Sequence, residues 1–331
     1  MASDNSNIFI VGNSRSGSTM LSNILNRNTN VYSFRELHFF DELLSDHLKE
    51  TDYPAVLAKL FATEEYICWN RDKKYREYLE LAKNLIREFE PASSYDLYTI
   101  FTRYFSEQKA VSHLVEQTPK NIFFVDLIEK QISKPTFISV IRNPQDVLLS
   151  QKYKWRRYLN GGNSTKRETM RLFFTYNPII HSIIYKRTIN QANSYEEKEN
   201  FYKIRFEDIL SNPEKEIREI CSFLRLSFHK DMLLIKHQSS SFEIKEGVGI
   251  TVDRKYNWLK GGLNKTEIFI NQRINKDIIL KEKYKTVDVV PNILILIFYF
   301  VILPLQLLFL MILDRKKIGG ILKILSKVKF W

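Results

Sequence analysis

Residues 7–21 read Asn-Ile-Phe-Ile-Val-Gly-Asn-Ser-Arg-Ser-Gly-Ser-Thr-Met-Leu. The apolar, β-rich run that ends at Gly12 is typical of a buried parallel strand, and the apolar spacing over residues 17–26 predicts a helix. A turn that joins a strand to the start of a helix aims backbone N–H groups and the helix dipole at one point. The segment therefore predicts a cradle for an anionic group.

This loop has the spacing of a P-loop but lacks its lysine. In the pattern G-x-x-x-x-G-K-[ST], Gly12 and Gly17 take the glycine positions and Ser18 takes the lysine position. Two glycines alone would fit an ordinary strand–turn–helix connection. The further donors in the loop favour a site for a phosphate or sulfate group. These donors are Arg15, Ser16, Ser18 and Thr19.

A second anion site is predicted at the end of the clearest strand, residues 135–141. That strand ends in Arg142, where a nucleotide hydrolase usually carries a carboxylate that holds Mg²⁺. Ser150 and Lys154 follow on one predicted helix face, although a solvated basic helix would look the same. Because the loop lysine and the carboxylate are both missing, ATP or GTP hydrolysis is disfavoured. We expect a pocket that binds anions without a metal ion.

The order of elements predicts an α/β fold. Strands over residues 7–11, 114–115, 135–141 and 201–206 alternate with helices, which implies a mostly parallel central sheet in a P-loop-like three-layer fold. With no linker before residue 286, we expect one catalytic domain over 1–286 and a separate segment over 287–331. The predicted helices cover residues 37–49, 55–61, 75–89, 95–105, 121–130, 166–188 and 212–224.

Composition points to a folded, anion-binding protein. The chain has 331 residues, is 44% hydrophobic and carries a net charge of +12, which favours anionic partners. The two cysteines, Cys68 and Cys221, exclude a disulfide framework and a cysteine-rich zinc module, and they fit a reducing compartment. Much of the positive charge lies in the last 18 residues, which hold six basic residues and one acid.

Residues 293–313 form an apolar run in which only Gln306 is strongly polar. Its length matches the hydrocarbon core of a bilayer, so we expect a membrane segment, although a buried core helix is the alternative. Pro304 predicts a kink, and basic residues on both flanks favour the cytoplasmic side. We therefore expect a re-entrant hairpin rather than a single transmembrane helix, with residues 318–330 as a basic amphipathic helix on the membrane surface. The short polar start predicts no secretory signal, so the catalytic domain should face the cytoplasm.

The motifs resemble the sulfotransferase family that uses 3′-phosphoadenosine 5′-phosphosulfate (PAPS), over residues 7–285. Residues 11–21 look like its 5′-phosphosulfate loop, in the arginine-bearing version of the tyrosylprotein and bacterial branches. Residues 140–150 look like its 3′-phosphate motif, and residues 204–224 resemble its later strand–helix segment. The resemblance implies an enzyme that transfers the sulfuryl group of PAPS, without a metal ion, to a hydroxyl of a glycan, lipid or lipid-linked acceptor. It implies no nucleic-acid partner.

The resemblance also implies roles for single residues. The loop would hold the sulfonate end of PAPS, and Arg142 and Ser150 would hold its 3′-phosphate. The stretch 247–258 is similar to the loop that closes over that phosphate. The residues so implied for the loop are Arg15, Ser16, Gly17, Ser18 and Thr19, and the cations of the closing stretch are Arg254 and Lys255.

Sulfuryl transfer needs a base for the acceptor hydroxyl. Glu36 matches the position of the family's catalytic glutamate, and Arg15 would stabilise the developing charge. His38 is a rival base because of its ordinary pKa, and Glu36 would otherwise be a structural partner of Arg35. Gln117 stands where a family motif has lysine, a role that Lys120 or Arg15 would then have to fill.

Two other functions stay open from the sequence. One is a small-molecule kinase with an altered P-loop. The other is a non-catalytic, membrane-tethered protein that binds anions, in which Glu36 is structural and Gln117 marks a lost catalytic group. The acceptor and the oligomeric state are not encoded in any motif that we find.

Overall fold

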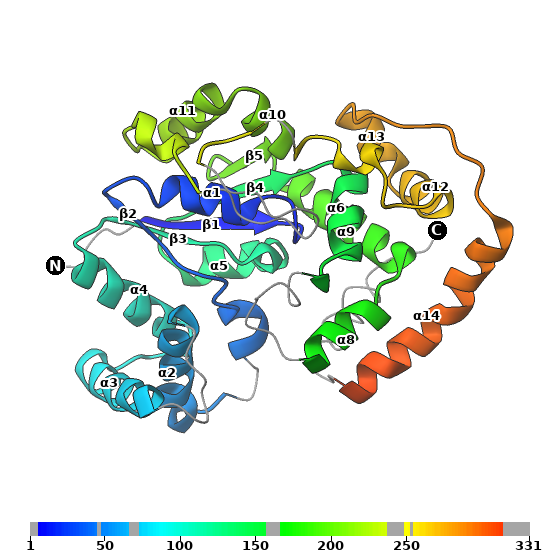
Figure 1. Cartoon of the computed structure of the whole chain (residues 1–331). Helices are drawn as coiled ribbons and strands as arrows, with labels where there is room; N and C mark the ends of the chain where they lie inside the picture. The colour runs from blue at the N-terminus through cyan, green and yellow to red at the C-terminus, as the bar shows by residue number, and fades with distance from the viewer. Residues whose placement is uncertain are drawn as a thin grey trace.

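The computed structural model describes residues 6–44, 48–65, 73–156, 166–236, 248–251 and 254–313. Within these residues a five-stranded sheet has the order β2-β3-β1-β4-β5, and every neighbouring pair is parallel (Figure 1). The predicted α/β fold with a parallel sheet is confirmed. The strands are β1 (Ser6–Gly12), β2 (Val31–Ser33), β3 (His113–Glu116), β4 (Pro135–Ile141) and β5 (Phe201–Arg205).

Helices cover both faces of the sheet because the side chains of β1 alternate between two cores. Ile8 and Ile10 pack among α1, α10 and α11, whereas Phe9 and Val11 pack among α2, α4 and α5. The right-hand end in Figure 1 carries α6, α8, α9, α12, α13 and α14. The bounds are α1 (Ser18–Leu25), α2 (Tyr53–Glu64), α3 (Lys73–Phe89), α4 (Asp96–Lys109), α5 (Val125–Gln131), α6 (Pro144–Lys152), α8 (Lys166–Phe174), α9 (Pro178–Ser194), α10 (Phe206–Ser211), α11 (Pro213–Phe223), α12 (Lys265–Ile274), α13 (Lys276–Lys281) and α14 (Ile293–Leu313).

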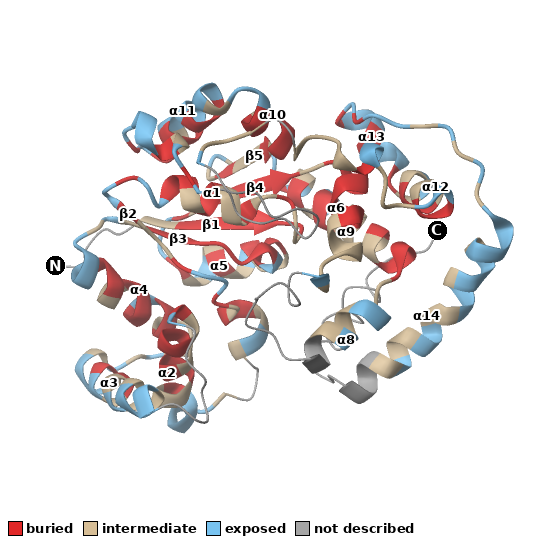
Figure 2. Cartoon of the chain, viewed as in Figure 1, coloured by how far each residue is buried: buried red, intermediate tan, exposed pale blue. Residues whose placement is uncertain are grey.

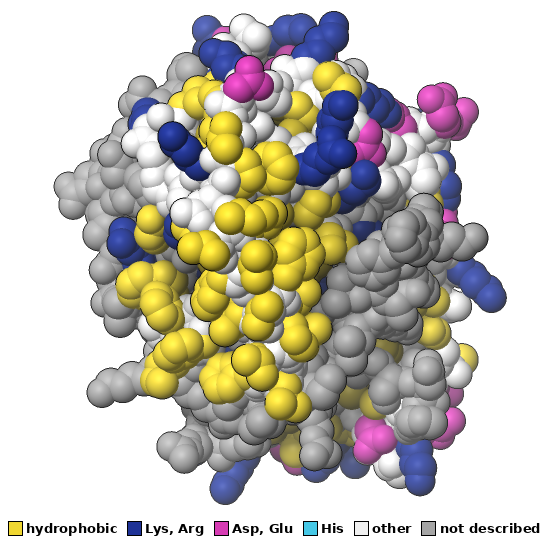
Figure 3. Space-filling model, turned by 90° about the vertical axis from the view of Figure 1, so that its right-hand side faces the viewer, with side chains coloured by type: hydrophobic (Ala, Val, Ile, Leu, Met, Phe, Trp, Pro, Cys, Tyr) yellow, Lys and Arg dark blue, Asp and Glu magenta, His cyan; other side chains and the backbone are white. Residues whose placement is uncertain are grey.

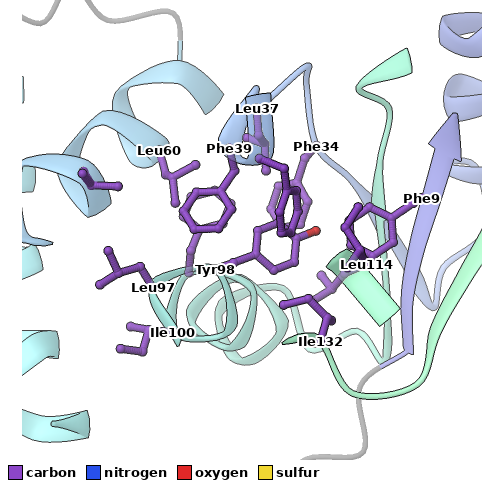
Figure 4. Packing of buried hydrophobic residues seen from close by; sticks show 14 of the residues in the cluster. Phe9, Phe34, Leu37, Phe39, Leu60, Leu97, Tyr98, Ile100, Leu114 and Ile132 are labelled. Atoms are coloured by element: carbon purple, nitrogen blue, oxygen red, sulfur yellow. The ribbon is translucent and has the colours of Figure 1, made fainter. Parts of the chain in front are cut away.

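An aromatic core fixes the chain just after β2. Figure 4 shows Phe34 and Phe39 packed around Tyr98 of α4, next to Phe9 of β1. The ring centroids of Phe39 and Tyr98 lie 5.5 Å apart, and those of Phe9 and Tyr98 lie 5.7 Å apart. Each fully buried Phe contributes about 1.5–3 kcal/mol. This packing holds residues 34–40 in place and leaves the polar residues between the buried ones, Arg35, Glu36 and His38, at least partly exposed.

Three predicted helices differ in the structure. In place of a helix over residues 37–49, the chain forms a π-helical turn at Phe39–Leu43 and a short 3₁₀ helix at Glu50–Asp52. The apolar side chains of Leu37, Phe39 and Phe40 are buried in the core, but they belong to an extended segment and a single turn. Their spacing therefore does not mark the face of a helix. The single helix predicted over 166–188 is α8 and α9, because Asn177 caps α9 and Pro178 begins it. Helix α6 ends at Lys152, so Lys154 does not share a helix face with Ser150.

The predicted re-entrant hairpin at the C-terminal end is wrong over the described residues. Helix α14 runs without a break from Ile293 to Leu313 and contains Pro304 in its interior. The proline removes one hydrogen bond, but contacts on both sides of it hold α14 to the start of α9: Asn177 Nδ2 donates to Tyr299 O and to Gln306 Oε1.

In the part of the chain that the structure describes, no helix is both long enough and apolar enough to cross a membrane. The single transmembrane helix, which is the alternative to the hairpin, is therefore not supported. The predicted basic helix over 318–330 lies outside the described residues.

Candidate active site

The loop after β1 fits closely between two neighbours, and its glycines make that fit possible. Gly12 has φ +132°, and a Cβ there would lie 2.8 Å from the carbonyl oxygen of Val140 in β4. Gly17 has φ +107°, and a Cβ there would lie 2.3 Å from the ring of Phe206. Only glycine avoids both the strain and the clash. The glycine spacing therefore reflects the close packing of the loop on β4 and α10.

The start of α1 presents open donors. Gly17 occupies the N-cap and offers no side-chain acceptor to the first turn of α1, which begins at Ser18 and Thr19. The free N–H groups and the helix dipole attract an anion at that point. Ser16 is 1% exposed, and its buried hydroxyl has no hydrogen-bond partner within the described part of the chain. An orphaned buried hydroxyl is unfavourable unless a ligand satisfies it, so the cradle fits a bound sulfonate or phosphate group.

The structure brings the two predicted anion sites together. Arg15 Nε donates to Ser150 Oγ at 2.9 Å, which joins the loop to α6. Arg142 Nη1 donates to the carbonyl oxygen of Arg15 at 3.3 Å, and Nη2 donates to that of Arg254 at 3.3 Å. Residues from three separate stretches of sequence thus surround one location. Lys255 joins a different contact, because its Nζ donates to Ser211 Oγ at 2.9 Å.

Arg142 is held so that part of its guanidinium remains unsatisfied. The group lies 4.5 Å from the ring centre of Phe206 and 4.0 Å from Asp146, which lies one turn further along the chain. Among the described residues its buried Nε has no hydrogen-bond partner. A planar cation with a spare donor, backed by an aromatic ring, is suited to bind an anionic oxygen. Phe206 and Asp146 were missed from the sequence, although the i,i+4 spacing of Arg142 and Asp146 is a usable signal.

Asp146 ties the stretch near Arg254 to the same site. Its carboxylate accepts hydrogen bonds from the backbone N–H of Tyr256 and of Trp258, both at 3.0 Å. Burial raises the pKa of Asp146, although the charge of Arg142 and the hydrogen bonds from these N–H groups act to lower it. Residues 254–258 are therefore fixed beside Arg142. The rest of the predicted closing stretch, residues 247 and 252–253, lies outside the described residues.

A chain of charged groups follows β2. The carboxylate of Glu36 lies 3.4 Å from His38 Nε2, and His38 Nδ1 lies 3.1 Å from Asp41 Oδ1. On the far side, Lys120 Nζ donates to Asp41 Oδ2 at 3.0 Å. His38 adopts φ +53°, which turns its ring between the two acids. Sequence reasoning named Glu36, His38 and Lys120 but missed Asp41, which connects them.

The network assigns protonation states to the two rival bases. Burial alone would lower the pKa of His38, but its hydrogen bonds to Asp41 and Glu36 raise that pKa to about 10. Burial alone would raise the pKa of Glu36. The hydrogen bond to His38 and the positive charges of His38, Lys154 and Arg15 instead hold that pKa below its usual value. At neutral pH Glu36 is therefore an ionised acceptor and His38 a protonated donor. The Glu36 side chain is 45% exposed, so an acceptor hydroxyl can reach it.

Gln117 lies at the carboxyl end of β3, next to this network. It is 8% exposed, and none of the residues that the structure describes forms a hydrogen bond with its Oε1. The preceding residue, Glu116, accepts hydrogen bonds from Thr118 at 2.7 Å and from Asn121 at 3.2 Å. Burial raises the pKa of Glu116 to about 7 despite these bonds. The orphaned amide oxygen of Gln117 is a polar atom that a ligand would satisfy.

His38, Asp41 and Glu42 bring potential metal-ligand atoms within 4.8 Å of one another. A protonated His38 does not ligate a cation, and the ammonium of Lys120 lies 3.0 Å from Asp41. These carboxylates therefore already have protein cations as partners.

Comparisons with known proteins agree with this geometry. A family model described as "Sulfotransferase family" matches residues 7–230. The sulfotransferase domain from the curacin biosynthetic pathway superposes with a TM-score of 0.55 at 20% identity, covering 86% of this chain and 99% of that chain. The sulfotransferase domain from the Synechococcus PCC 7002 olefin synthase gives 0.53 at 18% identity, covering 83% and 94%. No curated protein sequence matches the chain. These solved structures share its fold, and because the family model spans more than half of its length, the chain belongs to the sulfotransferase family.

Proposed function

We propose that this protein transfers the sulfuryl group of PAPS to a hydroxyl of a glycan, lipid or lipid-linked acceptor. The observation that supports this most is the contact of Arg15 with Ser150, which joins the loop cradle to the Arg142 site near an ionised Glu36. PAPS carries two anionic groups, the phosphosulfate and the 3′-phosphate, at opposite sides of one ribose. Two adjoining anion sites with a base beside one of them match that substrate.

In this proposal the loop holds the phosphosulfate end. The N–H groups at the start of α1, the hydroxyls of Ser16, Ser18 and Thr19, and the guanidinium of Arg15 surround the group that is transferred. Arg142, Ser150 and the stretch at Arg254 bind the 3′-phosphate, whereas the ammonium of Lys255 bonds to Ser211. Fixed donors of this kind stabilise charge as it develops, without first having to reorganise.

Glu36 supplies the base. As the acceptor oxygen forms its bond to sulfur, the bond from sulfur to the phosphate oxygen of PAPS breaks, and the acceptor proton passes to Glu36. His38 acts as a positioning residue, since its protonated ring holds the Glu36 carboxylate by the 3.4 Å ion pair. Arg15 stabilises the charge that develops on the leaving phosphate oxygen. Gln117 offers a neutral amide where an ammonium would stabilise an anion more strongly.

The cellular setting is part of the same proposal. We propose a catalytic domain over residues 1–286 that faces the cytoplasm and is attached to the membrane by the segment over 287–331. The apolar run over 293–313 and the basic residues that follow it support this arrangement. A membrane attachment favours a lipid or lipid-linked acceptor, since such an acceptor is confined to the same surface.

One experiment tests the chemistry directly. The purified protein is mixed with PAPS labelled with ³⁵S in the presence of membrane lipid and glycan extracts, and labelled products are separated from adenosine 3′,5′-bisphosphate. We expect label in an acceptor and equal release of the bisphosphate, with both lost in Glu36→Gln. Heat of binding with ATP–Mg²⁺ but not with PAPS would favour a kinase. Binding of PAPS without any turnover would favour the non-catalytic alternative.

A further inference from the structure

Helix α14 presents an apolar face away from the protein. Leu294, Phe298, Val301, Leu305 and Leu308 follow one another at i, i+4, i+7, i+11 and i+14, and each is between 53% and 74% exposed. Figure 2 shows no buried residue over the part of this helix whose burial is described, residues 293–309. Figure 3 shows a continuous field of hydrophobic side chains on that side of the molecule. In a helix that faces water these positions are normally polar. We call this face, together with the exposed Phe173 of α8, the α8–α14 surface.

The polar side chains of α14 lie on its opposite face. Tyr299 OH donates to Glu267 at 3.1 Å, and Gln306 Nε2 donates to the carbonyl oxygens of Phe174 at 2.9 Å and Tyr176 at 3.0 Å. The described part of the helix thus turns its polar groups toward the protein and its apolar groups outward. This arrangement is the inverse of an ordinary surface helix, and a contiguous apolar patch of this kind marks an interaction site.

The charges around the surface favour one occupant. Lys283 and Lys285 are exposed just before α14, and exposed Lys265 lies beside the start of the helix, where Asn292 N donates to Thr266 Oγ1 at 2.9 Å. After α14 the sequence continues into Arg315-Lys316-Lys317. Basic residues thus stand at both ends of the helix. A second copy related by a two-fold axis would bring these like charges together, whereas anionic lipid headgroups would neutralise them.

The surface adjoins the candidate active site. The ring of Trp155 contacts Phe173 of the surface edge-on at 5.4 Å between centroids. The neighbouring residue, Lys154, is close enough for its charge to act on the Glu36 carboxylate. Lys154 and Trp155, which follow α6, therefore link the two regions: Trp155 contacts the α8–α14 surface, and Lys154 lies near Glu36.

We propose that the α8–α14 surface rests on an anionic lipid bilayer, with α14 lying along the membrane plane. The side of the active site that carries Glu36, which we call the acceptor side, then lies beside the lipid headgroups. This deepens the membrane attachment proposed above and rests on the proposed function only for the identity of the acceptor. The acceptor is then an amphiphile whose hydroxyl lies at headgroup depth, so that it reaches Glu36 without leaving the membrane.

Vesicle binding tests the surface without PAPS. The full-length protein is sedimented with vesicles of phosphatidylcholine alone, or with vesicles that also contain anionic phosphatidylglycerol, the type of lipid to which basic protein surfaces bind. We expect binding to the anionic vesicles that weakens with salt. Leu305→Asp and, separately, Phe298→Ser should lower the partition coefficient at least about tenfold, since each places a polar group on the apolar face. The matched control is Leu234→Asp, at an equally exposed leucine after η4 (Lys230–Leu233), which packs near α1 and α11.

Further measurements separate the outcomes. PAPS binding by calorimetry should be unchanged in all three variants, which shows that they are folded. Fluorescence quenching by brominated lipid should fall in Trp155→Phe if the acceptor side meets the bilayer. No vesicle binding by the unmodified protein, or equal losses in Leu234→Asp and Leu305→Asp, would overturn the proposal. A dimer that Leu305→Asp converts to a monomer, without vesicle binding, would assign the surface to a second copy. A failure of sulfuryl transfer would leave the vesicle result standing.

Discussion

Replacement of Arg142 by alanine separates recognition of the 3′-phosphate from recognition of the rest of the nucleotide. The Arg142 side chain is 13% exposed, and its guanidinium lies 4.5 Å from the Phe206 ring. Its buried Nε has no hydrogen-bond partner among the residues that the structure describes. Its other two nitrogens donate to backbone carbonyls at 3.3 Å, which is long for a charged donor. The group is therefore placed to form shorter, charge-assisted bonds with an incoming phosphate.

The size of the effect follows from those bonds. Loss of a hydrogen bond to a charged partner costs about 1.5–3 kcal/mol. At about 1.4 kcal/mol per factor of ten, the affinity for PAPS should fall roughly 10- to 100-fold in Arg142→Ala. The affinity for the analogue that lacks the 3′-phosphate should change by less than about threefold, because the lost bond is absent from that complex. Arg142→Lys should recover part of the loss, since it keeps the charge but not the planar fork.

The assay is calorimetric titration of each variant with both nucleotides. Arg205→Ala is the matched control, because Arg205 ends the neighbouring strand β5 and pairs with Asp208 at 3.8 Å. It should affect both nucleotides alike. Since Arg142 also faces buried Asp146, melting temperatures are recorded to exclude unfolded protein. Equal losses for PAPS and for its analogue in folded Arg142→Ala would show that Arg142 does not read the 3′-phosphate.

Three further predictions concern the base, its partner and the loop. Glu36→Gln should abolish turnover and leave the affinity for PAPS within a few-fold, measured as kcat and Kd; retained activity in Glu36→Gln together with its loss in His38→Ala would make His38 the base. Because the pKa of His38 is raised from its ordinary 6.5 to about 10, its ion pairs stabilise the fold fully below pH 6.5, and that stability is lost as the pH rises through 10; His38→Gln should flatten the unfolding free energy across this window, and an unchanged pH profile would contradict the assignment. Gly17→Ala should cost about 1–3 kcal/mol of stability and weaken PAPS binding, because its Cβ would lie 2.3 Å from Phe206, and Phe206→Leu should restore part of both in thermal melts and titrations.

The fold could be predicted from sequence because its signals are local. The strand over residues 135–141 is observed with those bounds, since a short run rich in β-branched and aromatic residues is typical of a buried strand. The helix expected over 37–49 failed for a non-local reason. Phe34, Leu37 and Phe39 have spacings that suit several structures, and contacts with Tyr98, some sixty residues away, select an extended segment and a π-helical turn. Periodicity carries no information about such partners.

The same limit applies at the candidate site. The loop, Arg142 and Ser150 could be named because each stands in a motif, and the structure brings their side chains or backbone together. Asp41 could not be named, because its role depends on ion pairs with His38 and Lys120 that only the folded chain brings together. Asp146 was missed although its i,i+4 spacing from Arg142 is a signal, because the backbone N–H groups that it binds come from a distant stretch. Lys255 shows the converse: it fits the motif, yet its ammonium bonds to Ser211. A motif therefore predicts which residue type stands at a position, whereas tertiary contacts decide which group its charged side chain binds.

The outermost helix and the proposed 3′-phosphate site meet at one buried carboxylate. Glu267 of α12 is 0% exposed and accepts hydrogen bonds from Tyr299 of α14 at 3.1 Å and from Tyr176 at 3.0 Å, while its second oxygen lies 2.8 Å from Lys152 Nζ. Lys152 is the last residue of α6, the helix that begins beside Arg142 and carries Ser150. Removal of one partner from such a buried charge is costly. The position of α14 is therefore coupled to the end of α6, so the helix that forms most of the α8–α14 surface also belongs to the framework that positions the proposed 3′-phosphate site.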